Sequence, residues 1–100
     1  MTIKVKQLIN DNNRPAANQF VLSDDNGCYI FQSYSTTIAK VEDIDDSYTV
    51  TLDIDALDYS RTTSKHLYIW LRDYTRFDVH NKQDVLKLIK DDKVKTEVLN

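Results

Sequence analysis

The chain has 100 residues, of which 41% are hydrophobic and 10% aromatic, and its formal net charge is −3. This apolar content excludes an intrinsically disordered chain, and the length predicts one domain, 1–100, with one modest core. The acidic balance argues against broad nucleic-acid binding, which needs a basic surplus to neutralise phosphates. The sequence shows no apolar run of about 18 residues and no signal-peptide-like apolar region, so we expect a cytoplasmic protein with no membrane partner.

The single glycine and single cysteine restrict the possible cofactors. Glycine-rich loops that bind nucleotide phosphates need several glycines, which excludes them here. Cys28 can form neither an internal disulfide nor a cysteine-based zinc site, and we expect it to be a small buried side chain on a strand. His66 and His80 have no neighbouring cysteine and fit no usual metal-ligand spacing. We therefore expect no cofactor and no metal.

The first predicted element is short and ambiguous. Val5, Leu8 and Ile9 have the i, i+3, i+4 spacing of an apolar helix face, which predicts a short helix over 3–10. A strand over 3–6, where charged and apolar residues alternate, stays open as the alternative.

The clearest local signal is Asn26-Gly27 between two apolar, aromatic-rich runs. Both residue types tolerate positive φ, so the pair predicts a β-hairpin. We expect its strands at 18–23 and 28–41, the second with a bend near Ser35.

Two further patterns complete the predicted sheet. Strict alternation of apolar and polar residues predicts a half-buried antiparallel strand over 48–54. Alternation also places Ile38 and Ala39 on opposite sides of the preceding strand.

Two helices follow. Leu67, Trp70, Leu71 and Tyr74 form one apolar stripe of a helix over 63–74. The hydroxyl-rich stretch YSRTTSKHL (59–67) precedes that stripe. One hydroxyl of Ser60, Thr62, Thr63 or Ser64 should cap the helix, and Tyr59 should pack back on it.

The second helix is predicted over 81–91. Asn81 is a typical N-cap residue and Asp84 lies in the first turn, where the helix dipole favours a negative charge. The apolar stripe consists of Val85, Leu88 and Ile89.

The order of these elements predicts an α+β domain. Its sheet would be a three-stranded antiparallel meander (about 18–23, 28–41 and 48–54). The two C-terminal helices (about 63–74 and 81–91) would cover one face, and a short N-terminal element would complete the domain.

The hydroxyl-rich stretch also permits a chemical interpretation, with a Ser or Thr nucleophile and His66 as its base, or an anion at the helix N-terminus. The helix-cap interpretation is simpler, because no glycine-rich nucleophile elbow is present. A small hydrolase or transferase around Ser60–His66 is therefore the least favoured function.

The most unusual charge pattern lies in residues 41–60, which hold seven acids and no base. An EF-hand beginning at Asp43 is excluded, because Tyr48 would stand where glycine is needed and Ile54 where glutamate is needed. The simple interpretation is a solvated turn. The specific hypothesis is a patch that docks on a basic surface of a partner protein. Its candidate residues are Glu42, Asp43, Asp45, Asp46, Asp53 and Asp55.

An alternative places function in the C-terminal lysines, which would contact DNA or RNA in an accessory protein. These are Lys82, Lys87, Lys90, Lys93 and Lys95.

Three stretches carry a family resemblance: ANQF (17–20), YIFQSYSTTIAKV (29–41) and LDYSRTTSKHLYIWL (57–71). Together they resemble a family of small proteins carried by phages and mobile elements of Gram-positive bacteria, over roughly 5–75. The resemblance brings no catalytic residues. It implies a cytoplasmic phage or mobile-element accessory protein, a class that includes the anti-CRISPR proteins, which block a host nuclease by binding it. The resulting hypothesis is a non-enzymatic inhibitor whose acidic patch docks on the nucleic-acid-binding groove of an RNA-guided nuclease of the host.

Overall fold

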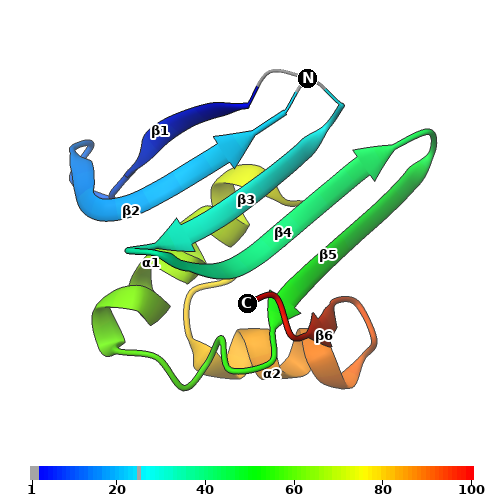
Figure 1. Ribbon diagram of the computed structural model, residues 1–100. Coiled ribbons are helices and arrows are strands. Elements are labelled where there is room, and N and C mark those ends of the chain that lie inside the picture. Colours follow the sequence, from blue (N-terminus) through cyan, green and yellow to red (C-terminus); the bar gives the residue numbers. More distant parts are fainter. Residues whose placement is uncertain (1–2, 25) are drawn as a thin grey trace.

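The computed structural model describes residues 3–24 and 26–100, which form a six-stranded sheet and two helices (Figure 1). The strands lie in the order β1-β2-β3-β4-β5-β6, and neighbours are antiparallel except for β5 and β6, which are parallel. The elements are β1 (Lys4–Ile9), β2 (Pro15–Ser23), β3 (Cys28–Ser33), β4 (Thr36–Ile44), β5 (Ser47–Asp53), α1 (Arg61–Tyr74), α2 (Lys82–Lys90) and β6 (Lys95–Glu97). The predicted three-stranded meander at 18–23, 28–41 and 48–54 is therefore wrong, although the α+β composition holds.

The N-terminal segment is strand β1, not the helix predicted over 3–10. It pairs with β2, and the register shifts between Gln7 and Ile9. Leu8 is buried, whereas Val5 and Ile9 are exposed. The apolar spacing thus arises from a strand with an irregularity, and pairing with β2 overrides the local helical pattern.

The segment predicted as one strand over 28–41 is two strands, β3 and β4, joined by the turn Tyr34-Ser35. The Asn26-Gly27 hairpin prediction is confirmed, because β2 and β3 pair across that turn and Gly27 has φ +87°. A Cβ on Gly27 would lie 2.4 Å from the carbonyl oxygen of Asp43, so the close approach of β4 also requires glycine.

A bulge in β4 changes which side chains face the core. Phe31 pairs with Ala39 and Gln32 pairs with Thr37, so Ile38 is an extra residue in β4. Both Ile38 and Ala39 are buried, and the prediction that they face opposite sides is wrong. A bulge turns two successive side chains toward one face, a feature that depends on the partner strand.

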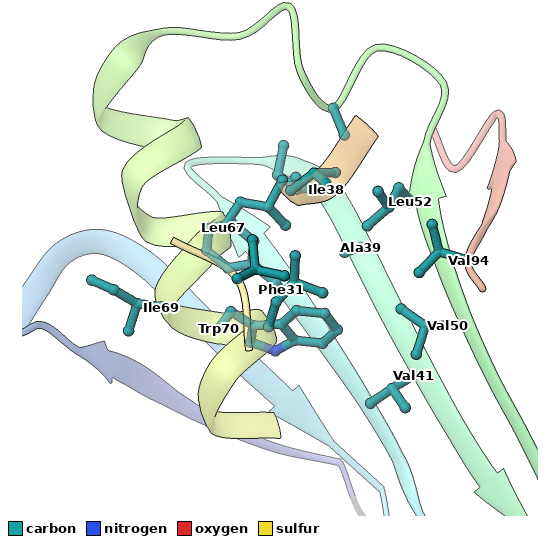
Figure 2. Packing of buried hydrophobic residues seen from close by; sticks show 14 of the residues in the cluster. Phe31, Ile38, Ala39, Val41, Val50, Leu52, Leu67, Ile69, Trp70 and Val94 are labelled. Atoms are coloured by element: carbon teal, nitrogen blue, oxygen red, sulfur yellow. The ribbon is translucent and has the colours of Figure 1, made fainter. Parts of the chain in front are cut away.

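Helix α1 packs along β3 through the stripe that the sequence predicted (Figure 2). Three contacts join them in succession: the Ser33 and Thr63 hydroxyls at 3.1 Å, the Phe31 and Trp70 rings with centroids 6.2 Å apart, and the Tyr29 and Tyr74 rings at 5.4 Å. Along these three contacts the residue numbers fall in β3 and rise in α1. The helix therefore runs antiparallel to the strand. It therefore covers one face of the sheet, as Figure 1 shows.

Both helix starts follow the predicted capping chemistry. The Ser60 hydroxyl accepts from the backbone N–H of Thr63 at 3.2 Å, and the Asn81 side chain accepts from Asp84 at 3.0 Å. Helix α2 contributes Val85 to the core, and the chain then returns as β6 beside β5. Neither helix in the described ranges is long and apolar enough to cross a membrane.

Candidate functional site

The predicted acidic patch is divided between the two ends of β5. Asp45 and Asp46 form the turn between β4 and β5, with φ of 48° and 65°, and both are exposed. Asp53 and Asp55 lie at and beyond the other end of the strand. Seven strand residues span about 20 Å, so the two groups of carboxylates lie at separate ends of the sheet and not in one cluster.

Asp53 is an internal anchor, which corrects its assignment as a partner-binding residue. Its exposed fraction is 3%. Its carboxylate accepts from the Leu99 N–H and the Tyr59 hydroxyl, both at 2.9 Å, and from the Asp55 N–H at 3.2 Å. The carboxylate thereby holds the C-terminal segment and the start of the β5–α1 connection onto β5. The Asp55 side chain is exposed but lies at this end, away from the β4–β5 turn.

These contacts shift the pKa of both Asp53 and Tyr59. Burial alone would raise the pKa of Asp53, but the hydrogen bonds from Leu99, Tyr59 and Asp55 outweigh burial and lower it below its ordinary value. Burial, followed by the hydrogen bond to Asp53 and the charge of that carboxylate, raises the pKa of Tyr59 to about 12. The sequence placed Tyr59 correctly before α1, but its hydroxyl contact could not be read from spacing.

The structure adds Asp24 to the carboxylates around the β4–β5 turn. The Asp24 carboxylate accepts from the Asn26 and Cys28 N–H groups at 2.8 and 3.2 Å. Cys28 pairs with Glu42, so the β2–β3 and β4–β5 turns lie at the same end of the sheet. We call this cluster the acidic end; it consists of Asp24, Glu42, Asp43, Asp45 and Asp46. The sequence signal for Asp24 is its position just before the predicted Asn26-Gly27 turn, which places it at this end of the sheet.

Two bases partly balance the acidic end. Lys40 Nζ lies 3.4 Å from Glu42, and the Arg76 guanidinium lies 3.8 Å from Asp43 and 4.0 Å from the centre of the Tyr48 ring. Within the described residues, Asp24, Asp45 and Asp46 form no ion pair. Exposed pairs are weak and screened by salt, so the end keeps a negative potential.

Cys28 lies on β3 as expected, but it is half-buried rather than buried. Burial first, then the charges of Asp24 and Glu42, raise the pKa of its thiol. A raised pKa disfavours the reactive thiolate, which fits a packing role.

The hydroxyl-rich stretch does not assemble a nucleophile and base. Ser60 caps α1, and buried Thr63 bonds to Ser33. His66 Nδ1 lies 2.7 Å from the carbonyl oxygen of Thr62, one turn earlier in its own helix. Within residues 3–24 and 26–100, no hydrogen bond joins His66 to a Ser or Thr hydroxyl, so this stretch is the start of a helix.

The C-terminal lysines are all exposed, on α2, the loop after it and β6. Lys95 lines a shallow groove of about 270 Å³ on the sheet, where Lys40, Glu42 and Glu97 also lie. Because two bases face two acids there, the groove does not extend a basic surface from α2.

The sheet face away from α1 has an apolar half that the sequence did not reveal. Strand pairing aligns Val5, Leu22 and Ile30 across β1, β2 and β3. A small apolar hollow of about 70 Å³ lies over Leu22, Cys28 and Ile30. Only the register shows that these residues adjoin.

No group of three His, Cys, Asp or Glu side chains in the described parts of the chain is arranged to hold a metal ion. In the comparison with known proteins, a family model described as a family of unknown function (DUF8033) matches residues 3–87. The chain belongs to this family. Neither a curated protein nor a solved structure matches it significantly.

The DUF8033 match spans β1 to most of α2. It therefore includes all five carboxylates of the acidic end and the Asp53 anchor. The family description names no reaction, partner or host, so any function must be argued from the chain itself.

Proposed function

We propose that this DUF8033 protein is a non-enzymatic binding protein that inhibits an RNA-guided nuclease in the cytoplasm of a bacterial host. The acidic end would dock on the basic groove in which the nuclease holds nucleic acid. One observation carries the proposal: two hairpin turns gather five carboxylates at one end of the sheet and leave Asp45 and Asp46 exposed in the β4–β5 turn.

The physical argument is electrostatic complementarity. A groove built for phosphates attracts a cluster of carboxylates, which speeds encounter and orients the two proteins. Asp45 and Asp46 have no ion pair within the described residues, so they remain available to a partner's bases. The resemblance to phage and mobile-element proteins supports a host nuclease as that partner.

The decisive experiment compares two double variants that remove the same charge from opposite ends of the molecule. Asp45→Asn with Asp46→Asn removes two charges and keeps the turn, because asparagine tolerates positive φ. Asp55→Asn with Asp58→Asn is the matched control at exposed positions. Binding to a purified, guide-loaded RNA-guided nuclease of a Gram-positive host is measured at two salt concentrations, together with inhibition of DNA cleavage.

We expect the first variant to lose about tenfold in affinity, equivalent to about 1.4 kcal/mol, mainly through slower association and with a weaker salt dependence. The control should lose clearly less affinity than the first variant, because its carboxylates lie outside the acidic end. Equal binding by both variants would exclude the acidic end as the contact. A protein that neither binds nor inhibits such a nuclease would refute the proposed function, and a shift of labelled DNA or RNA by the protein alone would favour the nucleic-acid accessory role.

A further inference from the structure

Tyr34 has a backbone conformation that its side chain disfavours. Seven residues in the described ranges have positive φ, namely Asn13, Asn18, Gly27, Tyr34, Asp45, Asp46 and Asp92. Six of them are Gly, Asn or Asp, the residue types that tolerate this region. Tyr34, at φ 55°, is the exception.

The turn that contains Tyr34 does not require a tyrosine. Ser33 pairs with Thr36, so Tyr34 and Ser35 form a two-residue hairpin loop. A first loop residue with positive φ is normally Gly, Asn or Asp in such hairpins. A bulky residue there destabilises the folded state relative to asparagine or glycine.

Within the described residues, the Tyr34 side chain makes no hydrogen bond and no ring stacking that would offset that strain. The residue is 62% exposed. The Tyr34 N–H donates to the carbonyl of Asn18, and its carbonyl accepts from Gln32 Nε2, both at 2.7 Å. Both bonds use the backbone of Tyr34 and would persist with asparagine, so the fold does not explain the ring.

We propose that Tyr34 is an anchor that inserts into an apolar pocket of a protein partner; this inference rests on the proposed function and adds a second contact to it. Rigid, amphipathic tyrosine is enriched among the residues that carry most of the binding energy at protein interfaces. The formal net charge of −3 disfavours binding to phosphates, so a protein pocket is favoured over nucleic acid.

Tyr34 and the acidic end fit within one interface. They lie at opposite ends of β3, whose six residues span about 17 Å. An interface of standard size covers about 800 Å² on each partner, which is wide enough to include both.

The test measures stability and affinity for the same guide-loaded nuclease in two variants. Tyr34→Asn should unfold at a higher urea concentration, because asparagine relieves the strain, and should lose about tenfold or more in affinity. Tyr34→Phe keeps both the ring and the strain. It should unfold like the unmodified protein and keep its affinity within about threefold.

Several results would overturn the inference. They are unchanged affinity in Tyr34→Asn, lower stability in Tyr34→Asn, or an equally large loss of affinity in Tyr34→Phe. If the unmodified protein binds the nuclease and Tyr34→Asn binds equally well, the role of Tyr34 is refuted and the proposed function stands. If the unmodified protein does not bind at all, the proposed function is refuted as well. If the protein shifts a labelled single-stranded oligonucleotide and Tyr34→Asn does not, the residue stacks on bases and the protein-pocket assignment is wrong.

Discussion

Replacing Asp53 with alanine should loosen the C-terminal segment from the sheet. The carboxylate is the shared acceptor for the Leu99 N–H, the Tyr59 hydroxyl and the Asp55 N–H. Its 3% exposed fraction leaves little room for water to replace it in the folded state. The three donors would therefore lose their partner together. The C-terminal segment would keep its strand pairing with β5 and the two hydrogen bonds between Asn100 and Thr37, but it would lose its attachment at Leu99.

The size of the effect follows from these three bonds. A hydrogen bond to a charged group contributes about 1.5–3 kcal/mol, but donors near the surface recover part of this from water. We expect Asp53→Ala to lower the free energy of unfolding by about 2–4 kcal/mol, a large share of the roughly 5–15 kcal/mol of a typical domain. For a chain of this length, that loss lowers the melting temperature by about 10–20 °C. Asp53→Asn keeps one acceptor oxygen and should lose about half as much.

The assay is urea denaturation followed by Trp70 fluorescence, with hydrogen exchange of the Leu99 amide as a local readout. Asp55→Ala is the matched control, because its exposed side chain accepts no hydrogen bond in the described structure and should change stability by less than about 0.5 kcal/mol. Acid titration adds a check on sign. Because the pKa of Asp53 is lower in the folded state, its stabilisation is present above the unfolded pKa of about 3.9 and is lost as the pH falls through the folded pKa. Asp53→Asn should lack that loss.

Two results would refute this reasoning. One is Asp53→Ala unfolding within about 0.5 kcal/mol of the unmodified protein. The other is unchanged protection of the Leu99 amide, which would mean that the segment is held by other contacts.

Three further predictions concern neighbouring features. Because the pKa of Tyr59 is raised from 10 to about 12, its stabilisation is complete below pH 10 and lost as the pH rises to 12; alkaline denaturation of Tyr59→Phe should lack this loss. Gly27→Ala should lower the free energy of unfolding by at least about 1 kcal/mol in urea, because of the positive φ and the contact with Asp43. Trp70→Ala should lower the free energy of unfolding by about 3–5 kcal/mol, seen by calorimetry, because the side chain is fully buried.

Each of these has its own contrary outcome. Equal alkaline stability of Tyr59→Phe and the unmodified protein would show that the hydroxyl does not couple folding to pH. A neutral Gly27→Ala would show that β4 can move away from the turn. Trp70→Phe keeps an aromatic ring and is the matched control for Trp70→Ala; equal losses from both would show that the indole does not fill its site in the core.

Elements that depend on neighbouring residues in the chain could be predicted from the sequence. Helix α1 begins beside a hydroxyl cap and was expected over 63–74, and it spans Arg61–Tyr74. Helix α2 begins after Asn81, as its capping chemistry indicated. The Asn26-Gly27 turn and the alternating strand at 48–54 were also recognisable, the latter observed as Ser47–Asp53. Caps, turns and periodicity act over a few residues, which is why a single sequence is enough to detect them.

The features that depend on strand pairing differ from the predictions for a physical reason. The predicted helix over 3–10 became β1 because β2 offers it a paired edge. The side of the sheet to which Ile38 turns depends on a bulge opposite Phe31. Strand β6 has only three residues and pairs with β5 after two intervening helices. The periodicity of one segment does not reveal these contacts, because each depends on how that segment pairs with another strand.

The same distinction between sequence and tertiary structure applies to the candidate site. The sequence alone established an acidic segment without bases over 41–60, since charge is a property of composition. Only the tertiary structure decided that Asp53 turns inward to hold Leu99 and Tyr59, and that Asp24 joins Asp45 and Asp46 at one end of the sheet. Whether a carboxylate stabilises the fold or faces a partner depends on which donors the fold brings within hydrogen-bond distance, and for Asp53 one of these donors, Leu99, comes from the C-terminal segment.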